Sequence, residues 1–151
     1  MGEAPAMTDN IGKFLVFSLQ GQRYGLDLAK VAEVGDSPRI SAIPLVPACY
    51  SGALNFNGDI VAVIDLALLL GLTGNERPGK IVVLHREVSS LAFLVEMVIR
   101  IAAENELTHR MPSDNAFAAA TLWLPDGDVT LLDLEAIIHE AENIIKPPKI
   151  T

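Results

Sequence analysis

The chain of 151 residues repeats itself, and this internal duplication constrains its fold more than any other feature of the sequence. The apolar run Phe14-Leu15-Val16-Phe17 is matched further along the chain by Ile81-Val82-Val83-Leu84. Each run is followed by a polar break and then by a second apolar stretch, at 24–34 and at 91–101. Two copies of one strand-rich unit are therefore expected, which is too few for a solenoid of stacked repeats.

The second part of each unit recurs as well, and Asp65 then corresponds to Asp133. Val63-Ile64-Asp65-Leu66 in the first copy matches Leu131-Leu132-Asp133-Leu134 in the second, and a Gly-Asp pair precedes each segment. A helix-like run follows each, at 66–72 and at 134–145. Since two separate segments recur in the same order at nearly the same offset, chance similarity between apolar strands is a poor explanation.

Turn-forming residues separate the predicted strands. Gln20-Gly21-Gln22, Asn57-Gly58 and the run 125–128 each lie between apolar segments and predict tight hairpin turns. Ser37-Pro38 interrupts one strand, and Pro44 with Pro47 brackets a stretch that cannot donate fully to a ladder. Short strands at regular spacing with such turns are typical of small closed β-barrels.

Two aspartates mark the starts of the predicted helices. Asp65 and Asp133 each end a strand and begin a helix, where a carboxylate accepts free amide groups of the first turn. The last helix, about 133–145, carries one apolar stripe that we expect to pack onto the barrels. Pro147-Pro148 ends it. The stripe consists of Leu134, Ile137, Ile138, Ala141, Ile144 and Ile145.

Composition and charge exclude several classes of protein. The net charge of −8 argues against a nucleic-acid or anionic-membrane surface, because both interactions need basic patches. The longest apolar stretch, 60–70, is interrupted by Asp65, so no membrane insertion is expected. Residues 1–10 lack the basic start and apolar core of a secretory signal, which predicts a cytoplasmic protein with a flexible tail over 1–12.

The residues that catalysis would require are missing. His85, His109 and His139 lie far apart, without a second ligand at metal spacing, and no nucleotide-binding or nucleophile motif occurs. Cys49, the only cysteine, excludes an intrachain disulfide and is interpreted as a small buried side chain beside Tyr50. The sequence therefore predicts no catalytic residue, no metal site and no cofactor.

The ordered set of motifs resembles the CheW family of chemotaxis adaptors over about residues 14–145. The resemblance implies a mainly β fold of two intertwined five-stranded SH3-like β-barrels with a C-terminal helix. On this basis a CheW-like domain is expected over 13–146, with the first barrel at about 13–73, the second at about 79–133 and the helix at about 133–145, followed by a tail over 147–151. The motifs are the opening 14–17, Tyr24-Gly25-Leu26-Asp27, Val31-Ala32-Glu33-Val34, Ile43-Pro44, Pro47, Gly52, Asn55-Phe56-Asn57-Gly58 and Val63-Ile64-Asp65-Leu66.

The same resemblance implies a function, namely coupling the cytoplasmic tips of chemoreceptors to the regulatory domain of the histidine kinase CheA. Asn57 stands where the family normally has arginine, whose forked, permanently charged donors an amide cannot reproduce. No ATP-binding or receiver motif accompanies the domain, so a free-standing adaptor is expected. The candidate receptor-binding residues are Val31, Glu33, Gly52, Asn55, Phe56, Asn57 and Gly58.

A second class of function remains open from the sequence. A groove between two barrels could be lined by Val31, Leu54 and Phe56 and could hold a small ligand. The sequence offers no convergent polar groups that would orient such a ligand. The alternative is therefore a ligand-binding or regulatory CheW-like module of a pathway that does not drive motility.

Overall fold

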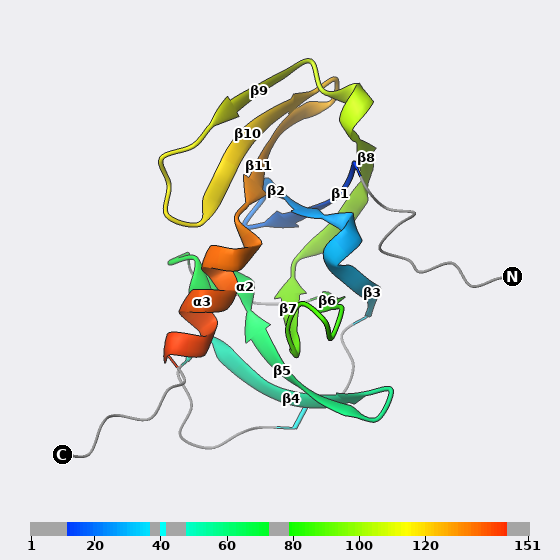
Figure 1. The fold of residues 1–151 in the computed structure, drawn as a ribbon, viewed down its shortest axis with the longest axis vertical. Helices are drawn as coiled ribbons and strands as arrows, with labels where there is room; N and C mark the ends of the chain where they lie inside the picture. The colour runs from blue at the N-terminus through cyan, green and yellow to red at the C-terminus, as the bar shows by residue number, and fades with distance from the viewer. Residues whose placement is uncertain (1–11, 37–39, 42–47, 73–78, 145–151) are drawn as a thin grey trace, which may run out of the picture.

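The computed structural model describes residues 12–36, 40–41, 48–72 and 79–144 (Figure 1). The structure does not describe residues 1–11 of the predicted tail over 1–12, nor any of the predicted tail over 147–151, which contains Pro147-Pro148. Ser37-Pro38, Pro44, Pro47 and Ile145 also lie outside the described residues. The elements in chain order are β1 (Lys13–Leu19), β2 (Gln22–Asp27), η1 (Leu28–Lys30), β3 (Val31–Asp36), β4 (Tyr50–Phe56), β5 (Asp59–Asp65), α2 (Leu66–Leu69), β6 (Lys80–Leu84), β7 (Leu91–Val95), β8 (Met97–Ala103), η2 (Glu104–Glu106), β9 (His109–Pro112), β10 (Ala118–Leu124), β11 (Gly127–Leu132) and α3 (Leu134–Ile144).

The described strands form two sheets, which confirms the prediction of a mainly β fold. One sheet has six strands in the order β8-β1-β2-β11-β10-β9, and the other has five in the order β3-β6-β7-β5-β4. The six-stranded sheet occupies the upper half of Figure 1 and the five-stranded sheet the lower half, with α3 beside α2 at one flank. The extra strand β9 has a shorter counterpart in the first copy, an isolated bridge between Ser41 and Ala53.

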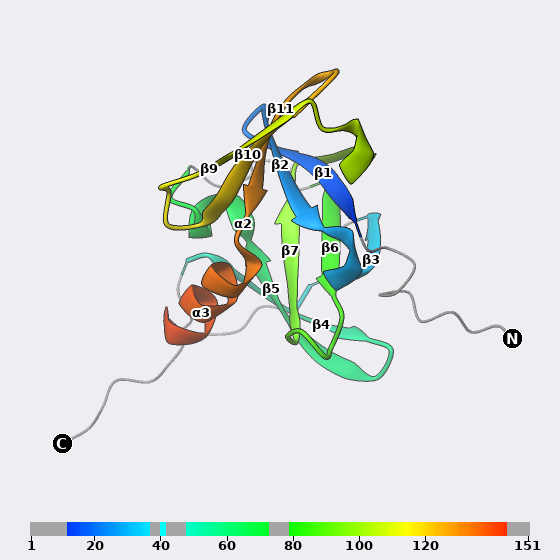
Figure 2. The same ribbon diagram turned by 45° about the horizontal axis from the view of Figure 1, so that its top comes forward.

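The two halves of the sequence exchange hairpins. The β1–β2 hairpin belongs to the sheet of β8 to β11, whereas the β6–β7 hairpin belongs to the sheet of β3 to β5 (Figures 1 and 2). Each exchanged hairpin joins its sheet partly through a parallel pair of strands, β2 with β11 in one sheet and β7 with β5 in the other. The ranges 13–73 and 79–133 therefore each contribute strands to both sheets, which is the physical meaning of intertwined barrels here.

The strand registers repeat along with the sequence. Ala32 has no partner residue in β6, so the register shifts between Val31 and Glu33 where β3 pairs with β6, as at a β-bulge. Ile99, at the equivalent position of the second copy, is passed over in the same way where β8 pairs with β1. Because these irregularities coincide, Glu33 and Arg100 occupy equivalent places in the two copies.

The hairpins β4–β5 and β10–β11 correspond pair by pair along their whole length, so the turn 57–58 is equivalent to the turn 125–126. Asn57 has φ 51° and Gly58 has φ 89°, as the predicted Asn-Gly turn requires. Gln20 and Gly21 show the same pattern, with φ 54° and 78°, in the β1–β2 turn. By strand register Gly58 corresponds to Asp126, not to Gly127. The Gly-Asp pairs that match in sequence, 58–59 and 127–128, are therefore offset by one residue in the structure.

Alternating side chains of the central strands divide the interior into three cores. In β1, Phe14 and Val16 face the interior of the six-stranded sheet, whereas Leu15 and Phe17 face the other sheet. Both faces of β1 are thus buried, which explains its uninterrupted apolar sequence. The core between the two sheets, called the central core below, includes Leu15, Phe17, Leu26, Ile64, Val82, Phe93, Val95 and Ile137.

Asp65 and Asp133 both accept hydrogen bonds from first-turn amides. Oδ1 of Asp65 accepts from the amide of Leu68 at 3.4 Å, and Oδ1 of Asp133 accepts from the amide of Ala136 at 3.1 Å. The helix α2 is shorter than the expected 66–72, because Gly71 adopts φ 86°. The amides of Gly71 and Leu72 then donate back to Leu68 and Ala67, the arrangement that closes a helix at a left-handed glycine.

The helix α3 lies against the central core through Ile137 and Ala141, both fully buried. The hydroxyl of Tyr50 in β4 donates to the carbonyl oxygen of Ala141 at 2.6 Å in a buried hydrogen bond. Burial raises the pKa of Tyr50 to about 12, so this hydroxyl keeps its proton at neutral pH. The expected helix over 133–145 is observed over Leu134–Ile144 among the described residues.

Replacing Asp65 with alanine should lower the free energy of unfolding by about 1 kcal/mol, because an amide of α2 loses its acceptor. For a domain of this size the melting temperature should fall by roughly 3 °C. Differential scanning calorimetry measures the change. Asp114→Ala is the control, since Asp114 is exposed outside any helix or strand. Equal melting temperatures for the wild type and Asp65→Ala would show that the cap contributes nothing.

Candidate functional site

A hollow of about 370 Å³ opens on the five-stranded sheet. Three segments that are distant in sequence line it: the bulged start of β3, the tip of the β4–β5 hairpin and the connection from β6 to β7. The side chains of Phe56, Val61 and Leu84 make its apolar part. Its charged lining consists of Glu33, Asp59, Arg86 and Glu87.

The predicted receptor-binding residues divide into three groups by position. Glu33, Phe56 and Asn57 line the hollow together, although the first comes from β3 and the other two from the β4–β5 hairpin. Asn55 and Gly58 shape the hairpin tip, since Oδ1 of Asn55 accepts the amide of Gly58 at 3.0 Å. The hairpin pairs Asn55 with Ile60 and Phe56 with Asp59, so the Asn55 side chain points away from the hollow.

The remaining two predicted residues, Val31 and Gly52, are buried. Val31 is only 5% exposed and belongs to the central core, so its side chain is not available to a partner. Leu54 and Phe56 pack instead against the interior core of the five-stranded sheet. The expected groove lined jointly by Val31, Leu54 and Phe56 is therefore not formed, because the core fills the seam between the sheets.

Gly52 is required by a close approach of the backbone. A Cβ atom placed on Gly52 would lie 2.2 Å from the carbonyl oxygen of Ser41 and 2.6 Å from Cγ2 of Ile40. Its φ of 150° is also one that other residues rarely adopt. Because Gly52 has no Cβ, the backbone of Ser41 can approach β4 closely enough to pair with Ala53. The role of Gly52 at the site is therefore structural.

The connection from β6 to β7 contributes residues that sequence reasoning did not assign to a site. The residues of this connection that line the hollow are His85, Arg86, Glu87, Ser89 and Ser90. The repeat marked this stretch only as the polar break after β6, and nothing in its composition indicates which hairpin it faces. Nη1 of Arg86 lies 3.3 Å from Oδ2 of Asp59, an exposed ion pair that contributes little to stability.

A second depression, about 570 Å³, lies between α3, Lys30 of η1 and the same β6–β7 connection. Val88, Leu134 and Ile138 form its apolar part, and Glu87 borders both depressions. It contains none of the residues predicted from the sequence to bind a receptor. We therefore take the hollow on the five-stranded sheet as the candidate site.

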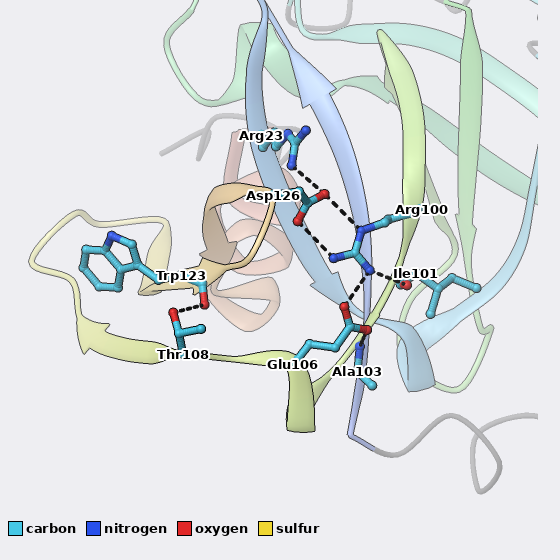
Figure 3. Close-up of polar contacts among 8 residues, drawn as sticks. All are labelled: Arg23, Arg100, Ile101, Ala103, Glu106, Thr108, Trp123 and Asp126. Carbon is cyan, nitrogen blue, oxygen red and sulfur yellow. Dashed lines mark hydrogen bonds and ion pairs between the residues drawn. The ribbon is translucent and has the colours of Figure 1, made fainter.

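The equivalent place in the second copy holds a network of ion pairs (Figure 3). The carboxylate of Asp126 accepts from Arg23 Nη1 at 3.1 Å and from Arg100 Nε and Nη2 at 3.2 and 3.0 Å. Arg100 Nη1 also lies 2.9 Å from Oε1 of Glu106, whose other oxygen accepts the amide of Ala103. These contacts join β2, β8, η2 and the tip of the β10–β11 hairpin.

The described residues contain no cluster of three or more side chains that could hold a metal ion. Burial raises the pKa of the Cys49 thiol, which keeps it in its less reactive protonated form. His85, His109 and His139 lie on different elements, and His139 contacts Asn143 on its own helix. No described helix is long and apolar enough to cross a membrane.

Comparison with known proteins identifies the family. The family model of the CheW-like domain matches residues 13–142, and the chain therefore belongs to this family. The chemotaxis protein CheW of Klebsiella aerogenes is 32% identical over 141 residues, which cover 86% of this chain and 83% of that protein. The chemotaxis protein CheW of Treponema pallidum is 27% identical over 107 residues, which cover 67% of this chain and 63% of that protein.

A solved structure is similar over most of its length. The crystal structure of the scaffolding protein TtCheW from Thermoanaerobacter tengcongensis superposes with a TM-score of 0.68 at 27% sequence identity. The match covers 82% of this chain and 89% of that chain. The similarity in sequence and the similarity in structure thus agree on the family.

Replacing Gly52 with alanine should destabilise the protein by about 2 kcal/mol, because the new Cβ displaces the Ser41 segment and strains the backbone. Urea unfolding should show a lower midpoint with an unchanged slope. Gly35→Ala in β3 is the control, since a Cβ there meets no atom within 4 Å. Similar losses in both variants would mean that the close approach does not determine the residue.

Hydrogen bonds from Arg100, and further from Arg23, hold the pKa of Asp126 well below its usual value of 3.8. A carboxyl whose pKa is depressed by folding stabilises the protein above its unfolded pKa, and this stabilisation is lost as the pH falls. Asp126→Asn should therefore lower the melting temperature at pH 7, and the difference from the wild type should begin to narrow as the pH falls below about 3.8.

The measurement is a series of thermal melts between pH 7 and pH 3 at low salt. Asp128→Asn, on the same hairpin, is the control because Asp128 is exposed and forms no ion pair with another described residue. A difference between Asp126→Asn and the wild type that does not change with pH would contradict the electrostatic explanation.

Proposed function

We propose that this chain is a non-catalytic adaptor that couples the cytoplasmic tips of chemoreceptors to the regulatory domain of the histidine kinase CheA. Membership of the CheW-like domain family supports this function. The observation that carries it is the hollow on the five-stranded sheet, where Glu33, Phe56 and Asn57 come together. The protein would act in the cytoplasm, at receptor arrays on the membrane.

A receptor tip, as a helical hairpin, would lie across the hollow with its apolar ridge against Phe56. Phe56 is half-buried: its side chain packs against the interior core and still lines the opening of the hollow. Glu33, Asn57 and Glu87 would form the polar rim. Aromatic anchors surrounded by a polar rim are where binding energy concentrates in protein interfaces.

The kinase would occupy a different surface. Ile60 is 69% exposed on the β4–β5 hairpin, on the side away from the hollow. An exposed apolar residue on a hairpin at the edge of a sheet suits stacking against the barrels of the kinase. Because receptor and kinase would then bind separate faces, one adaptor could hold both, and many weak contacts would add up in an array.

A small-ligand-binding or regulatory module is the second candidate function. The hollow falls within the size range of ligand pockets, and it contains the convergent charged groups that the sequence did not reveal. Screening by thermal shift with polar metabolites distinguishes the two. A saturable shift together with failure to bind any receptor tip would favour the ligand-binding function.

Phe56→Ala should weaken binding to a receptor tip about tenfold or more, because it removes the apolar anchor. The measurement is calorimetric titration with purified cytoplasmic fragments of the chemoreceptors of the source organism. Ile60→Ala is the matched control, since it truncates an exposed apolar residue on the same hairpin outside the hollow. Circular dichroism establishes that both variants remain folded.

Unchanged receptor affinity in Phe56→Ala would remove this residue from the site. Absence of binding by the wild type to every receptor fragment and to the kinase regulatory domain would overturn the proposed function itself.

A further inference from the structure

The two copies of the repeat contain the same structural site with different charges. Glu33 and Arg100 are equivalent by register, each just after the bulge of its strand. The hairpin turn 57–58 is likewise equivalent to 125–126. In the same alignment of the two copies, Ser90 corresponds to Arg23. The charged network of the second copy and the hollow of the first copy are therefore the same place in the two barrels.

In the second copy this place is filled from within the chain. Two guanidinium groups, those of Arg23 and Arg100, meet on the carboxylate of Asp126 at the hairpin tip (Figure 3). Arg100 contacts Glu106 as well, so one cation lies between two carboxylates. Guanidinium groups suit such a position because their donors are forked and their charge is permanent.

In the first copy the equivalent place is open and acidic. Glu33 replaces Arg100, and Ser90 replaces Arg23, so both guanidinium groups are missing. Among the residues that the structure describes, three carboxylates line the hollow against one arginine, Arg86, which is already paired with Asp59. Within the part of the chain that the structure describes, neither Glu33 nor Glu87 forms an ion pair.

The apolar part of the hollow completes the requirements for a long basic side chain. The half-buried Phe56, beside the buried side chains of Val61 and Leu84, offers a surface for the methylene stem of an arginine or lysine. The face of an aromatic ring near a cation adds a further attraction. Glu33 and Glu87 at the rim would then receive the charged head, from other positions than in the second copy, where Asp126 at the position of Gly58 holds the guanidinium.

We propose that the hollow binds a basic side chain, arginine in preference to lysine, presented by the receptor tip. That the receptor tip presents this side chain rests on the proposed function. That the hollow prefers a basic side chain rests on the comparison of the two copies. The head group lies between Glu33 and Glu87, and its stem lies on Phe56. The partner thereby supplies in trans the guanidinium that the second copy supplies in cis.

The first test uses the full chain and a defined probe, N-acetyl-arginine methylamide, with backbone amides followed by NMR. We expect saturable shifts at Glu33, Asn57 and Glu87, with a dissociation constant of roughly millimolar order, as for a single charged contact. The corresponding glutamate and norleucine amides should cause no such shifts. Equal shifts from the norleucine or glutamate amide would overturn the proposal, because they would show no selection for a cation.

Paired variants locate the contact. Glu33→Gln with Glu87→Gln should abolish the saturable shifts, since both exposed carboxylates of the rim are neutralised without loss of volume. Glu104→Gln, an exposed carboxylate outside the hollow, is the control and should bind the arginine probe like the wild type. Undiminished shifts in the double variant would contradict the site.

The second test measures the receptor tip fragment itself. The double variant should bind it at least fivefold more weakly than the wild type, with a shallower dependence on salt concentration, because fewer charges are paired across the interface. Equal affinity and equal salt dependence would reject the receptor as the source of the basic side chain while leaving the adaptor function intact. Failure of the wild type to bind any receptor fragment would instead reject the adaptor function, and the arginine titration alone would then decide the chemistry of the hollow.

Discussion

The structure depends on the burial of one strand hairpin from each half of the chain inside the sheet of the other half. β1 and β2 are central in the six-stranded sheet, and β6 and β7 are central in the five-stranded sheet. The side chains of β1, β6 and β7 alternate between a barrel interior and the central core, so these three strands are apolar on both faces. The largest fully buried side chains, Phe17 and Phe93, lie in this exchanged layer.

This arrangement leaves the outer strands and turns free to differ between the copies. The central core must satisfy both sheets at once, so its positions keep their apolar character, as Leu26 and Phe93 do. Glu33 and Arg100 lie on edge strands beside exposed turns, where opposite charges fit the same backbone. Duplication has thus produced one barrel closed by its own ion pairs and one that presents an open acidic hollow.

Much of the local structure could be predicted from the sequence, because it is determined by neighbouring residues. The Asn57-Gly58 turn, the helix after Asp133 and the duplication itself follow from short patterns. The burial of Val31, the contact that requires Gly52 and the lining from 85–90 could not be predicted, because each depends on pairing between distant strands. Apolar periodicity shows that a strand is buried without showing which sheet contains it.

The exchange of hairpins also affects how the molecule comes apart. A chain with two barrels in series would lose them one after the other on heating. Here neither sheet keeps its middle strands unless the opposite half of the polypeptide is present, so both barrels must melt in a single calorimetric transition. If the chain were cleaved between its two halves, each fragment would lack the middle strands of its own sheet. The fragments would accordingly refold only by associating with each other.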